Sequence, residues 1–166
     1  MAREYLKKAT LTSASDAGET QAIVKDILDA IETGREDTAR AYAAKFDRYD
    51  GNVLLTREEI DAATARVPER LKDDIRFAHD NVRRFAEAQL VTVSDFETEV
   101  LPGLIAGQKA IPVDAAGCYV PGGRYSHVAS AVMTVTTAKV AGCRTITACS
   151  PPRPGIGIAP AIVYAA

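Results

Sequence analysis

Apolar residues recur at helical spacing in the first part of the chain. Val24, Ile27, Leu28 and Ile31 lie at positions i, i+3, i+4 and i+7, which places them on one face of a helix. Gly34 follows this stripe and predicts that the helix ends there. The same spacing then predicts a second short helix, carried by Ala39, Tyr42, Ala43 and Phe46.

Two further helices are predicted before residue 90, after a possible short strand at residues 53–55. Thr56 is followed three residues later by Glu59, a capping-box signature that predicts the start of a helix. Pro68 suits the first turn of the next helix. That helix is predicted to run to about Gln89, with an apolar stripe formed by Leu71, Ile75, Ala78, Val82 and Phe85.

The pattern changes after Leu90. Residues 91–100 suit an extended segment, and Pro102-Gly103 predicts a turn. The elements predicted beyond that turn are strands at 104–113 and 115–120, a buried helix at 128–142, a strand at 144–149 and a helix beginning at 159.

Residues 115–149 therefore form a strand–helix–strand unit. Two neighbouring parallel strands need such a crossover, and parallel sheets are normally covered on both faces. The predicted fold class is α/β: a helical N-terminal region, residues 1–100, followed at residues 101–166 by the first part of a doubly wound, Rossmann-like nucleotide-binding domain. One such unit is too little for a whole domain, so we expect the fold to be incomplete.

The charged residues support this division. Residues 1–100 hold 15 basic and 21 acidic side chains, whereas residues 101–166 hold six charged side chains in all. The second part is therefore predicted to be interior, and it needs other elements to cover it.

Composition excludes several classes of protein. The net charge of −2 gives no basic surface for non-specific binding to nucleic acid, and no apolar run approaches the roughly 20 residues of a membrane helix. The first residues lack the apolar core of a secretory signal. Three cysteines in predicted apolar elements are interpreted as buried, reduced thiols, which fits a cytoplasmic protein: Cys118, Cys143 and Cys149.

The candidate chemistry lies at residues 117–127. A strand that ends in Pro121-Gly122-Gly123 before a helix forms a crevice of the kind in which α/β sheets bind ligands. Glycines allow a ligand to approach the backbone closely, and Arg124 offers a forked donor to an anion. The same residues also fit a tight structural turn followed by a solvated arginine.

Several segments together resemble the histidinol dehydrogenase family. They are Tyr-Val-Pro-Gly-Gly at 119–123, Ser-Ala-Val-Met at 130–133, the segment 138–143, Cys-Ser-Pro-Pro at 149–152, and upstream the segments 34–37 and 44–47. The resemblance covers most of the chain.

This resemblance implies an NAD-dependent, zinc-containing dehydrogenase that oxidises a primary alcohol to a carboxylate in two NAD-linked steps. It also implies a cytoplasmic homodimer acting on a small-molecule alcohol, without nucleic acid or membrane partners. Tyr119 corresponds to a family tyrosine that contacts NAD, and we group Gly122 and Gly123 with it as cofactor-binding residues. The family's zinc ligands and its Glu–His acid/base pair are expected downstream of Ala166, so no catalytic or metal-binding residue is assigned within the chain.

The residues after the two glycines bear on the substrate. Arg124-Tyr125-Ser126-His127 resembles the branch of the family that acts on sulfopropanediol, whose pattern has a proline where Ser126 stands. We expect His127, with Arg124, to hold the anionic end of such a substrate, although an ordinary histidine at a helix start fits as well. Histidinol as the substrate, and a non-catalytic α/β fragment or nucleotide-binding module, remain the alternatives.

Two other basic residues are not assigned to a site. His79 has no second metal ligand at i+4 and is interpreted as a solvated or hydrogen-bonded histidine. Lys139 is the one charge in an apolar helix, and its ammonium group is expected to reach solvent.

Overall fold

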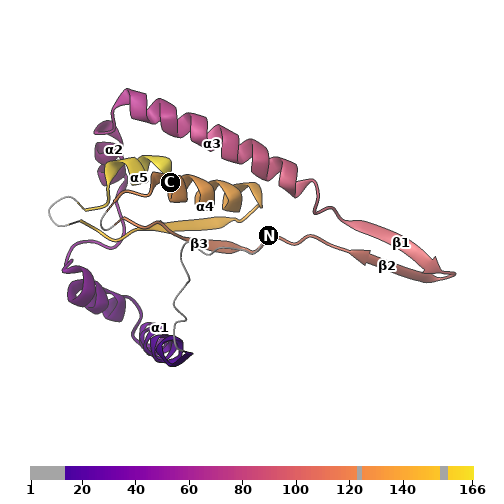
Figure 1. Ribbon diagram of the computed structural model, residues 1–166, viewed down its shortest axis with the longest axis horizontal. Coiled ribbons are helices and arrows are strands. Elements are labelled where there is room, and N and C mark those ends of the chain that lie inside the picture. The colour runs from indigo at the N-terminus through magenta and orange to yellow at the C-terminus, as the bar shows by residue number, and fades with distance from the viewer. Residues whose placement is uncertain (1–13, 123–124, 154–156) are drawn as a thin grey trace, which may run out of the picture. The chain divides into compact units, whose positions relative to one another are not determined.

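The computed structural model describes residues 14–122, 125–153 and 157–166 (Figure 1). The elements follow one another as α1 (Ala14–Tyr42), the π-helix η1 (Ala43–Asp47), α2 (Arg57–Ala65), α3 (Glu69–Leu90), β1 (Phe96–Leu101), β2 (Leu104–Gln108), β3 (Ala115–Tyr119), α4 (Val128–Val140), β4 (Thr145–Cys149) and α5 (Pro160–Ala165). The chain forms two compact units, Met1–Asp50 and Gly51–Ala166. The boundary at residue 100 stays a prediction.

The first unit contains two helical segments with a break where the sequence predicts one. Arg35 has non-helical backbone angles, φ 53° and ψ −137°, directly after Gly34. The second segment continues into η1, where the rings of Tyr42 and Phe46 stack with their centroids 5.6 Å apart. The predicted break and the second apolar stripe are therefore both present.

The second unit opens with the predicted capping box. Thr56 Oγ1 accepts a hydrogen bond from the Glu59 backbone N at 3.2 Å, and Glu59 Oε2 accepts one from the Thr56 backbone N at 2.7 Å. Pro68 is the N-cap of α3, one position before the helix rather than inside its first turn. The strand predicted at residues 53–55 is wrong, because Val53 and Leu54 form a bend and none of the three residues belongs to a strand.

Strands β1 and β2 form an antiparallel hairpin around the predicted turn, in which Gly103 has a φ of +81°. All residues of both strands are exposed, and the hairpin packs against no other described helix or strand. The strand predicted to reach residue 113 ends at Gln108, where side chains close the ribbon. Gln108 Nε2 donates to Ser94 O, and Asp95 Oδ1 accepts from the Ala110 backbone N.

The predicted strand–helix–strand unit is confirmed. β3 and β4 pair in parallel, in register from Ala115 opposite Thr145 to Tyr119 opposite Cys149, and α4 packs on both strands. Adjacent residues of β3 differ sharply in exposure: Cys118 is 4% exposed and Tyr119 is 63% exposed. Since side chains alternate across a strand, α4 covers one face of the sheet and the described residues leave the other open.

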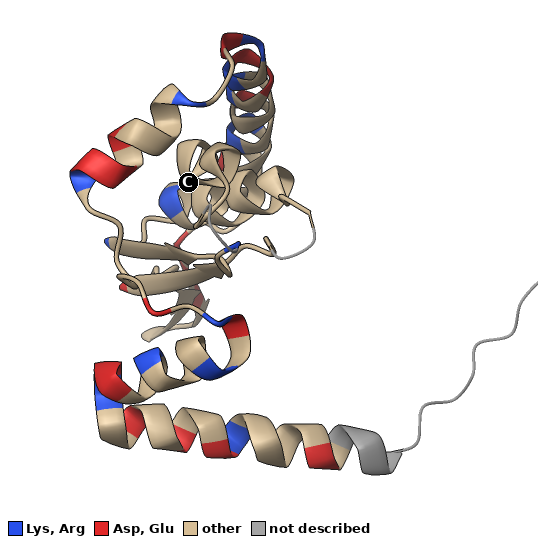
Figure 2. Cartoon of the chain, turned by 90° about the vertical axis from the view of Figure 1, so that its left-hand side faces the viewer, with Lys and Arg blue, Asp and Glu red and all other residues tan. Residues whose placement is uncertain are grey.

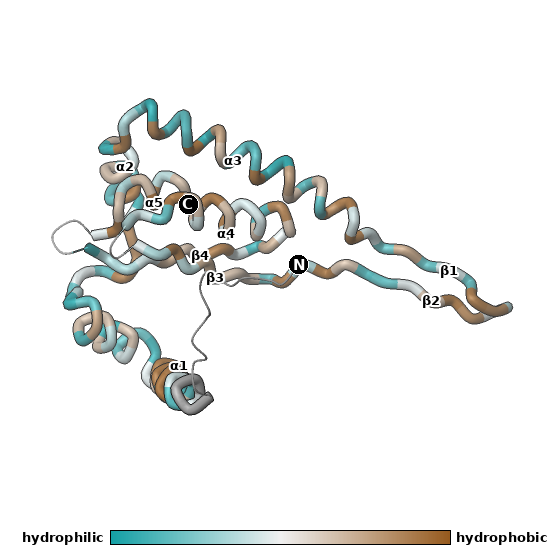
Figure 3. The backbone as a smooth tube through the Cα atoms, in the orientation of Figure 1, coloured by the Kyte–Doolittle hydropathy of each residue, from teal (hydrophilic) through white to brown (hydrophobic). Residues whose placement is uncertain are grey.

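Much of residues 101–166 is exposed in the described part of the chain, so the predicted need for covering elements remains. Large apolar side chains such as those of Ile105, Val113 and Met133 are exposed, and Figure 3 shows apolar stretches along α4 and the hairpin. Figure 2 confirms that Lys, Arg, Asp and Glu are concentrated on the preceding helices. Low charge indicates a surface suited to burial, but the described residues do not supply a cover for it.

The core cluster lies where α4, α5 and the end of β3 meet, and consists of Val120, Ala131, Ala159 and Ile162. All three cysteines are free thiols. Cys118 and Cys143 are buried as predicted, but Cys149 is exposed because its side chain lies on the open face of the sheet. No helix among the described residues is long and apolar enough to span a bilayer.

Candidate functional site

The candidate site is the crevice at the carboxyl ends of β3 and β4. The Val120 backbone N donates to Cys149 O at 2.8 Å, which continues the ladder one step beyond the strands and holds the two following loops side by side. Tyr119 is the last residue of β3, and its ring lies on the face that α4 leaves open. The crevice therefore has an exposed aromatic ring at its edge.

Gly122 stands where the two loops touch. It is buried, and a Cβ at this position would lie 2.3 Å from Ser150 Oγ and 3.4 Å from Pro151 O. Arg153 Nε donates to Gly122 O at 2.9 Å and ties the second loop to the first. The missing side chain of Gly122 therefore leaves room for the Ser150 hydroxyl, which would have to move to accommodate a Cβ.

Ser150 adds an unpaired polar group to this contact. Its Oγ is buried and has no hydrogen-bond partner among the described residues. A buried hydroxyl without a partner costs about 1–3 kcal/mol. Sequence reasoning missed both Ser150 and Arg153. The rule that ligands bind at the carboxyl ends of strands identified the loop after β3, and it applies equally to the loop after β4.

His127 is placed at the start of α4, as its N-cap. Its backbone N donates to Pro121 O at 3.2 Å, so the loop after β3 folds back on the helix start. The side chain is exposed and makes no capping hydrogen bond, and α4 has no acidic residue in its first turn. Gly123 and Arg124 lie outside the described residues.

Tyr119, Gly122 and His127 follow one another from the end of β3 to the start of α4, and the loop after β4 brings Ser150 and Arg153 against Gly122. The described residues contain no group of three or more His, Cys, Asp or Glu residues that could hold a metal ion. The arrangement can expose backbone and aromatic surface to a ligand, and no metal chemistry can be derived from these residues.

Parallel strands joined by a helix, with a buried glycine where the two following loops meet, define the start of a doubly wound α/β domain. The family model described as histidinol dehydrogenase matches residues 11–166, so the chain belongs to the histidinol dehydrogenase family.

Known relatives agree with this assignment. The chain is 71% identical over its whole length to a sulfopropanediol 3-dehydrogenase of Ruegeria pomeroyi, of which it covers 38%. It is 40% identical, over 93% of its length, to the histidinol dehydrogenase of Salmonella typhimurium, of which it covers 34%. The crystal structure of histidinol dehydrogenase from Elizabethkingia anophelis matches 98% of this chain and 36% of that one, with a TM-score of 0.79 and 28% identity. The chain thus spans little more than a third of these relatives.

Proposed function

We propose that the chain is the N-terminal part of a zinc- and NAD-dependent dehydrogenase that oxidises a primary alcohol to a carboxylate in two NAD-linked steps. The substrate we propose is 2,3-dihydroxypropane-1-sulfonate, which would yield sulfolactate. The observation that carries this proposal is the 71% identity, along the whole chain, to a relative named as a sulfopropanediol 3-dehydrogenase. The histidinol dehydrogenase of Salmonella typhimurium is 40% identical.

The crevice supports binding of a nicotinamide cofactor. NAD, when bound, accepts a hydride from the alcohol carbon. Tyr119 offers an exposed ring for contact with it, and we expect the glycines at positions 122 and 123 to let the cofactor approach the loop backbone. The buried, unpaired hydroxyl of Ser150 lies against Gly122.

The proposed substrate has a sulfonate group that is anionic at every physiological pH. His127 at the start of α4, together with Arg124, would donate charge-assisted hydrogen bonds to it. The free backbone N–H groups of the helix start favour an anion in the same place. Histidinol carries a cationic amine instead, which an arginine at this position would repel.

Zinc and the acid/base residues belong, in this proposal, to the longer enzyme beyond the matched segment. The described residues offer no cluster of metal ligands, so the contribution of this chain is to bind and orient cofactor and substrate. We also propose that the longer enzyme is a cytoplasmic homodimer, a state supported by the exposed apolar side chains of the hairpin and sheet.

The rate of NADH formation tests the activity directly. The longer enzyme that carries this segment should oxidise sulfopropanediol with a kcat/KM at least about tenfold higher than its kcat/KM for L-histidinol, a difference of about 1.4 kcal/mol in transition-state binding. A preference for histidinol would overturn the proposed substrate. NADH formation by the 166-residue chain alone would contradict the view that it lacks the catalytic groups.

The KM and kcat of a His127 variant test whether this residue binds the substrate. In the longer enzyme, His127→Ala should raise the KM for sulfopropanediol while kcat changes little, because the lost contact is made equally in the ground and transition states. His79→Ala is the matched control, since His79 lies on α3 away from the crevice. An unchanged KM in His127→Ala would remove His127 from the substrate site.

A further inference from the structure

Arg153 lies in the loop after β4, and its side chain reaches the loop after β3, 31 residues earlier in the chain. Its Nε donates to Gly122 O at 2.9 Å, and the hydrogen bond is partly buried. Gly122 is itself buried, and a buried carbonyl group is costly to leave without a partner. The guanidinium therefore holds the Gly122 carbonyl in one direction.

The backbone of Arg153 is anchored as well. Arg153 and Gly157 exchange both of their backbone hydrogen bonds, at 2.9 and 3.0 Å, and Gly157 has a φ of +71°, which favours glycine. Ala159, two residues further on, belongs to the core cluster with Val120 and Ile162. The arginine thus extends from a part of the chain that the core holds in place.

Two other contacts join the same loops near Gly122, but neither bonds to its carbonyl. The Val120 backbone N donates to Cys149 O at 2.8 Å. Ser150 Oγ lies against the glycine and has no hydrogen-bond partner among the described residues. In the described part of the chain, the direction of this carbonyl is therefore set by the side chain of Arg153.

The direction of a peptide group matters to a ligand that binds along the backbone. Because the peptide bond is planar, turning its carbonyl also turns the N–H group of the same peptide. In doubly wound α/β folds, the glycine-containing loop after a strand lets its backbone approach the pyrophosphate of a dinucleotide. A side chain that fixes one peptide of such a loop affects the ligand without touching it.

We propose that Arg153 is a positioning residue for the nicotinamide cofactor. By holding the Gly122 carbonyl, it sets the backbone of the loop after β3 in the orientation that binds the cofactor. This inference rests on the proposed function and adds to the cofactor site a residue of the loop after β4. Direct contact between the guanidinium and the phosphates of the cofactor is a different role, and the experiment separates the two.

Glutamine and methionine at position 153 separate the hydrogen bond from the charge. Both remove the charge, but glutamine carries its Nε2 donor at the side-chain position of the arginine Nε, where methionine carries a methyl group. In the longer enzyme, fluorescence titration should show that Arg153→Met raises the Kd for NADH about fivefold, the factor that one hydrogen bond represents. Arg153→Gln should stay within about twofold of wild type, because the donor is kept.

Two results of this titration would overturn the positioning role. One is an unchanged Kd in folded Arg153→Met. The other is a Kd in Arg153→Gln as high as in Arg153→Met, with Arg153→Lys like wild type, which is the pattern of a direct charge contact with the phosphates. Circular dichroism verifies the fold of each variant, since a merely structural role lowers the amount of folded enzyme and leaves the Kd of the folded fraction unchanged.

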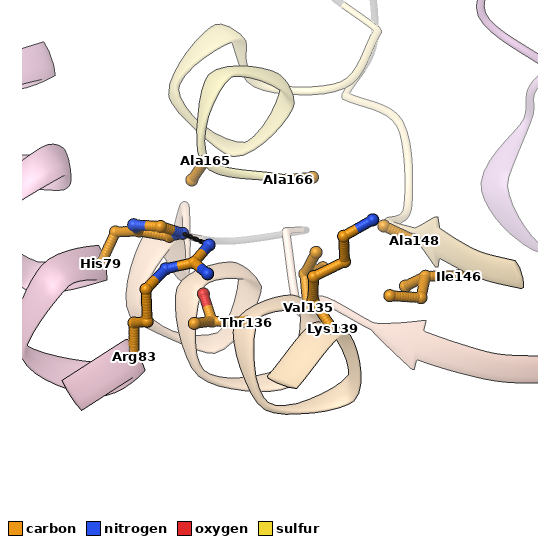
Figure 4. A pocket seen from close by; sticks show the side chains of 9 residues that line it. All are labelled: His79, Arg83, Val135, Thr136, Lys139, Ile146, Ala148, Ala165 and Ala166. Carbon is orange, nitrogen blue, oxygen red and sulfur yellow. Dashed lines mark hydrogen bonds between the residues drawn. The ribbon is translucent and has the colours of Figure 1, made fainter. Parts of the chain in front are cut away.

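Two other arginines provide matched controls. Arg144 Nη2 bonds to Asp114 Oδ1 at 2.6 Å across 30 residues, at the amino ends of β3 and β4. Arg83 makes a partly buried contact, 3.3 Å from His79 Nε2, beside the C-terminal half of α4 (Figure 4). Arg144→Met and Arg83→Met should bind NADH like wild type. A rise in Kd equal to that of Arg153→Met in either control would overturn the assignment to the crevice.

The Tyr119→Ala variant distinguishes a failure of this inference from a failure of the proposed function. A raised Kd in Tyr119→Ala without a rise in Arg153→Met leaves the cofactor site in place and overturns only the positioning role. Unchanged Kd values in both variants overturn the cofactor site and, with it, the role of Arg153. We expect both variants to bind NADH more weakly, with Arg153→Gln close to wild type.

Discussion

At the scale of single residues, the crevice depends on the contact between Gly122 and Ser150. A Cβ at Gly122 would lie 2.3 Å from Ser150 Oγ, closer than any van der Waals contact allows. Gly122→Ala should therefore lower the free energy of unfolding by about 1–3 kcal/mol, the usual cost of overpacking. Urea denaturation of the two proteins measures the difference.

The paired control for this prediction is Gly117→Ala. A Cβ at Gly117 meets nothing within 4 Å, so this change should leave the stability of the folded chain nearly unaltered. Replacing Ser150 by glycine in the Gly122→Ala background should restore part of the lost stability, because it removes the clashing hydroxyl. An equal loss in both alanine variants would show that the cost does not come from the contact with Ser150.

At the residue scale, the sequence predicts that a ligand approaches the backbone at Gly122, and this stays a prediction. The structure shows a different close approach there, because the loop after β4 packs against the glycine. Ser150 gives no sequence signal, because an unpaired buried hydroxyl is recognised only when its surroundings are known.

At the scale of elements, the capping box that opens α2 has a measurable effect. Thr56→Ala removes the side chain that accepts from the Glu59 backbone N and should cost about 1 kcal/mol of stability. Glu59→Gln keeps a side chain able to accept from the Thr56 backbone N and should cost much less. Thermal unfolding compares the two variants, and equal losses would contradict the reciprocal bonding.

An ion pair in the first turn of α3 should make the free energy of unfolding depend on pH. The hydrogen bond from Lys72 Nζ, 2.8 Å from Glu69 Oε1, lowers the pKa of Glu69 below its ordinary value. A lowered pKa in the folded state stabilises the protein above the unfolded-state pKa, and this stabilisation is lost as pH falls through the folded-state value.

Urea denaturation at a series of acidic pH values checks this expectation. The stability advantage of wild type over Glu69→Gln should shrink as pH falls from about 6 to about 3. Lys72→Met removes the same hydrogen bond and should show the same reduced dependence. An advantage that stays constant over this range would contradict the assignment to Glu69.

Elements with local signals were predicted well, and those without them were not. The capping box, the Gly34 break and the 115–149 unit carry explicit sequence signals, and all three are present. Residues 53–55 have the composition of a strand but no neighbouring strand to pair with. A ladder is a property of two segments, so one segment cannot specify it.

At the scale of the whole molecule, the described chain leaves much apolar surface exposed. The β1–β2 hairpin makes no contact with the other described helices and strands, and side chains such as those of Leu101 and Ile105 are more than half exposed. A two-stranded hairpin is at best marginally stable alone in water. We therefore expect the isolated chain to self-associate as its concentration rises.

Analytical ultracentrifugation across a concentration series measures this self-association. Replacing both Leu101 and Ile105 by serine should shift the equilibrium toward the monomer. Thr98→Ser, at an exposed polar position of β1, provides the control and should not shift the equilibrium. A wild-type chain that stays monodisperse and melts cooperatively as a monomer would contradict the prediction.

The sparse charge of residues 101–166 predicts a surface that other elements cover, and the described residues cover one face of the β3–β4 sheet. Composition indicates which surface is suited to burial, but it does not identify the element that covers it. α4 covers one face of the β3–β4 sheet, and the other face carries the exposed Tyr119 ring. The family relatives are longer than this chain, which covers 38% of the sulfopropanediol 3-dehydrogenase it matches.

The central claim is that the crevice at the ends of β3 and β4 binds the nicotinamide cofactor, and the affinity of the longer enzyme for NADH tests it most directly. Fluorescence titration should show that Tyr119→Ala raises the Kd about tenfold, a loss of about 1.4 kcal/mol, while Tyr119→Phe changes it little because the ring is kept. Thr145→Ala, at the opposite end of the same open sheet face, is the control and should bind NADH like wild type. An unchanged Kd in folded Tyr119→Ala would contradict the claim.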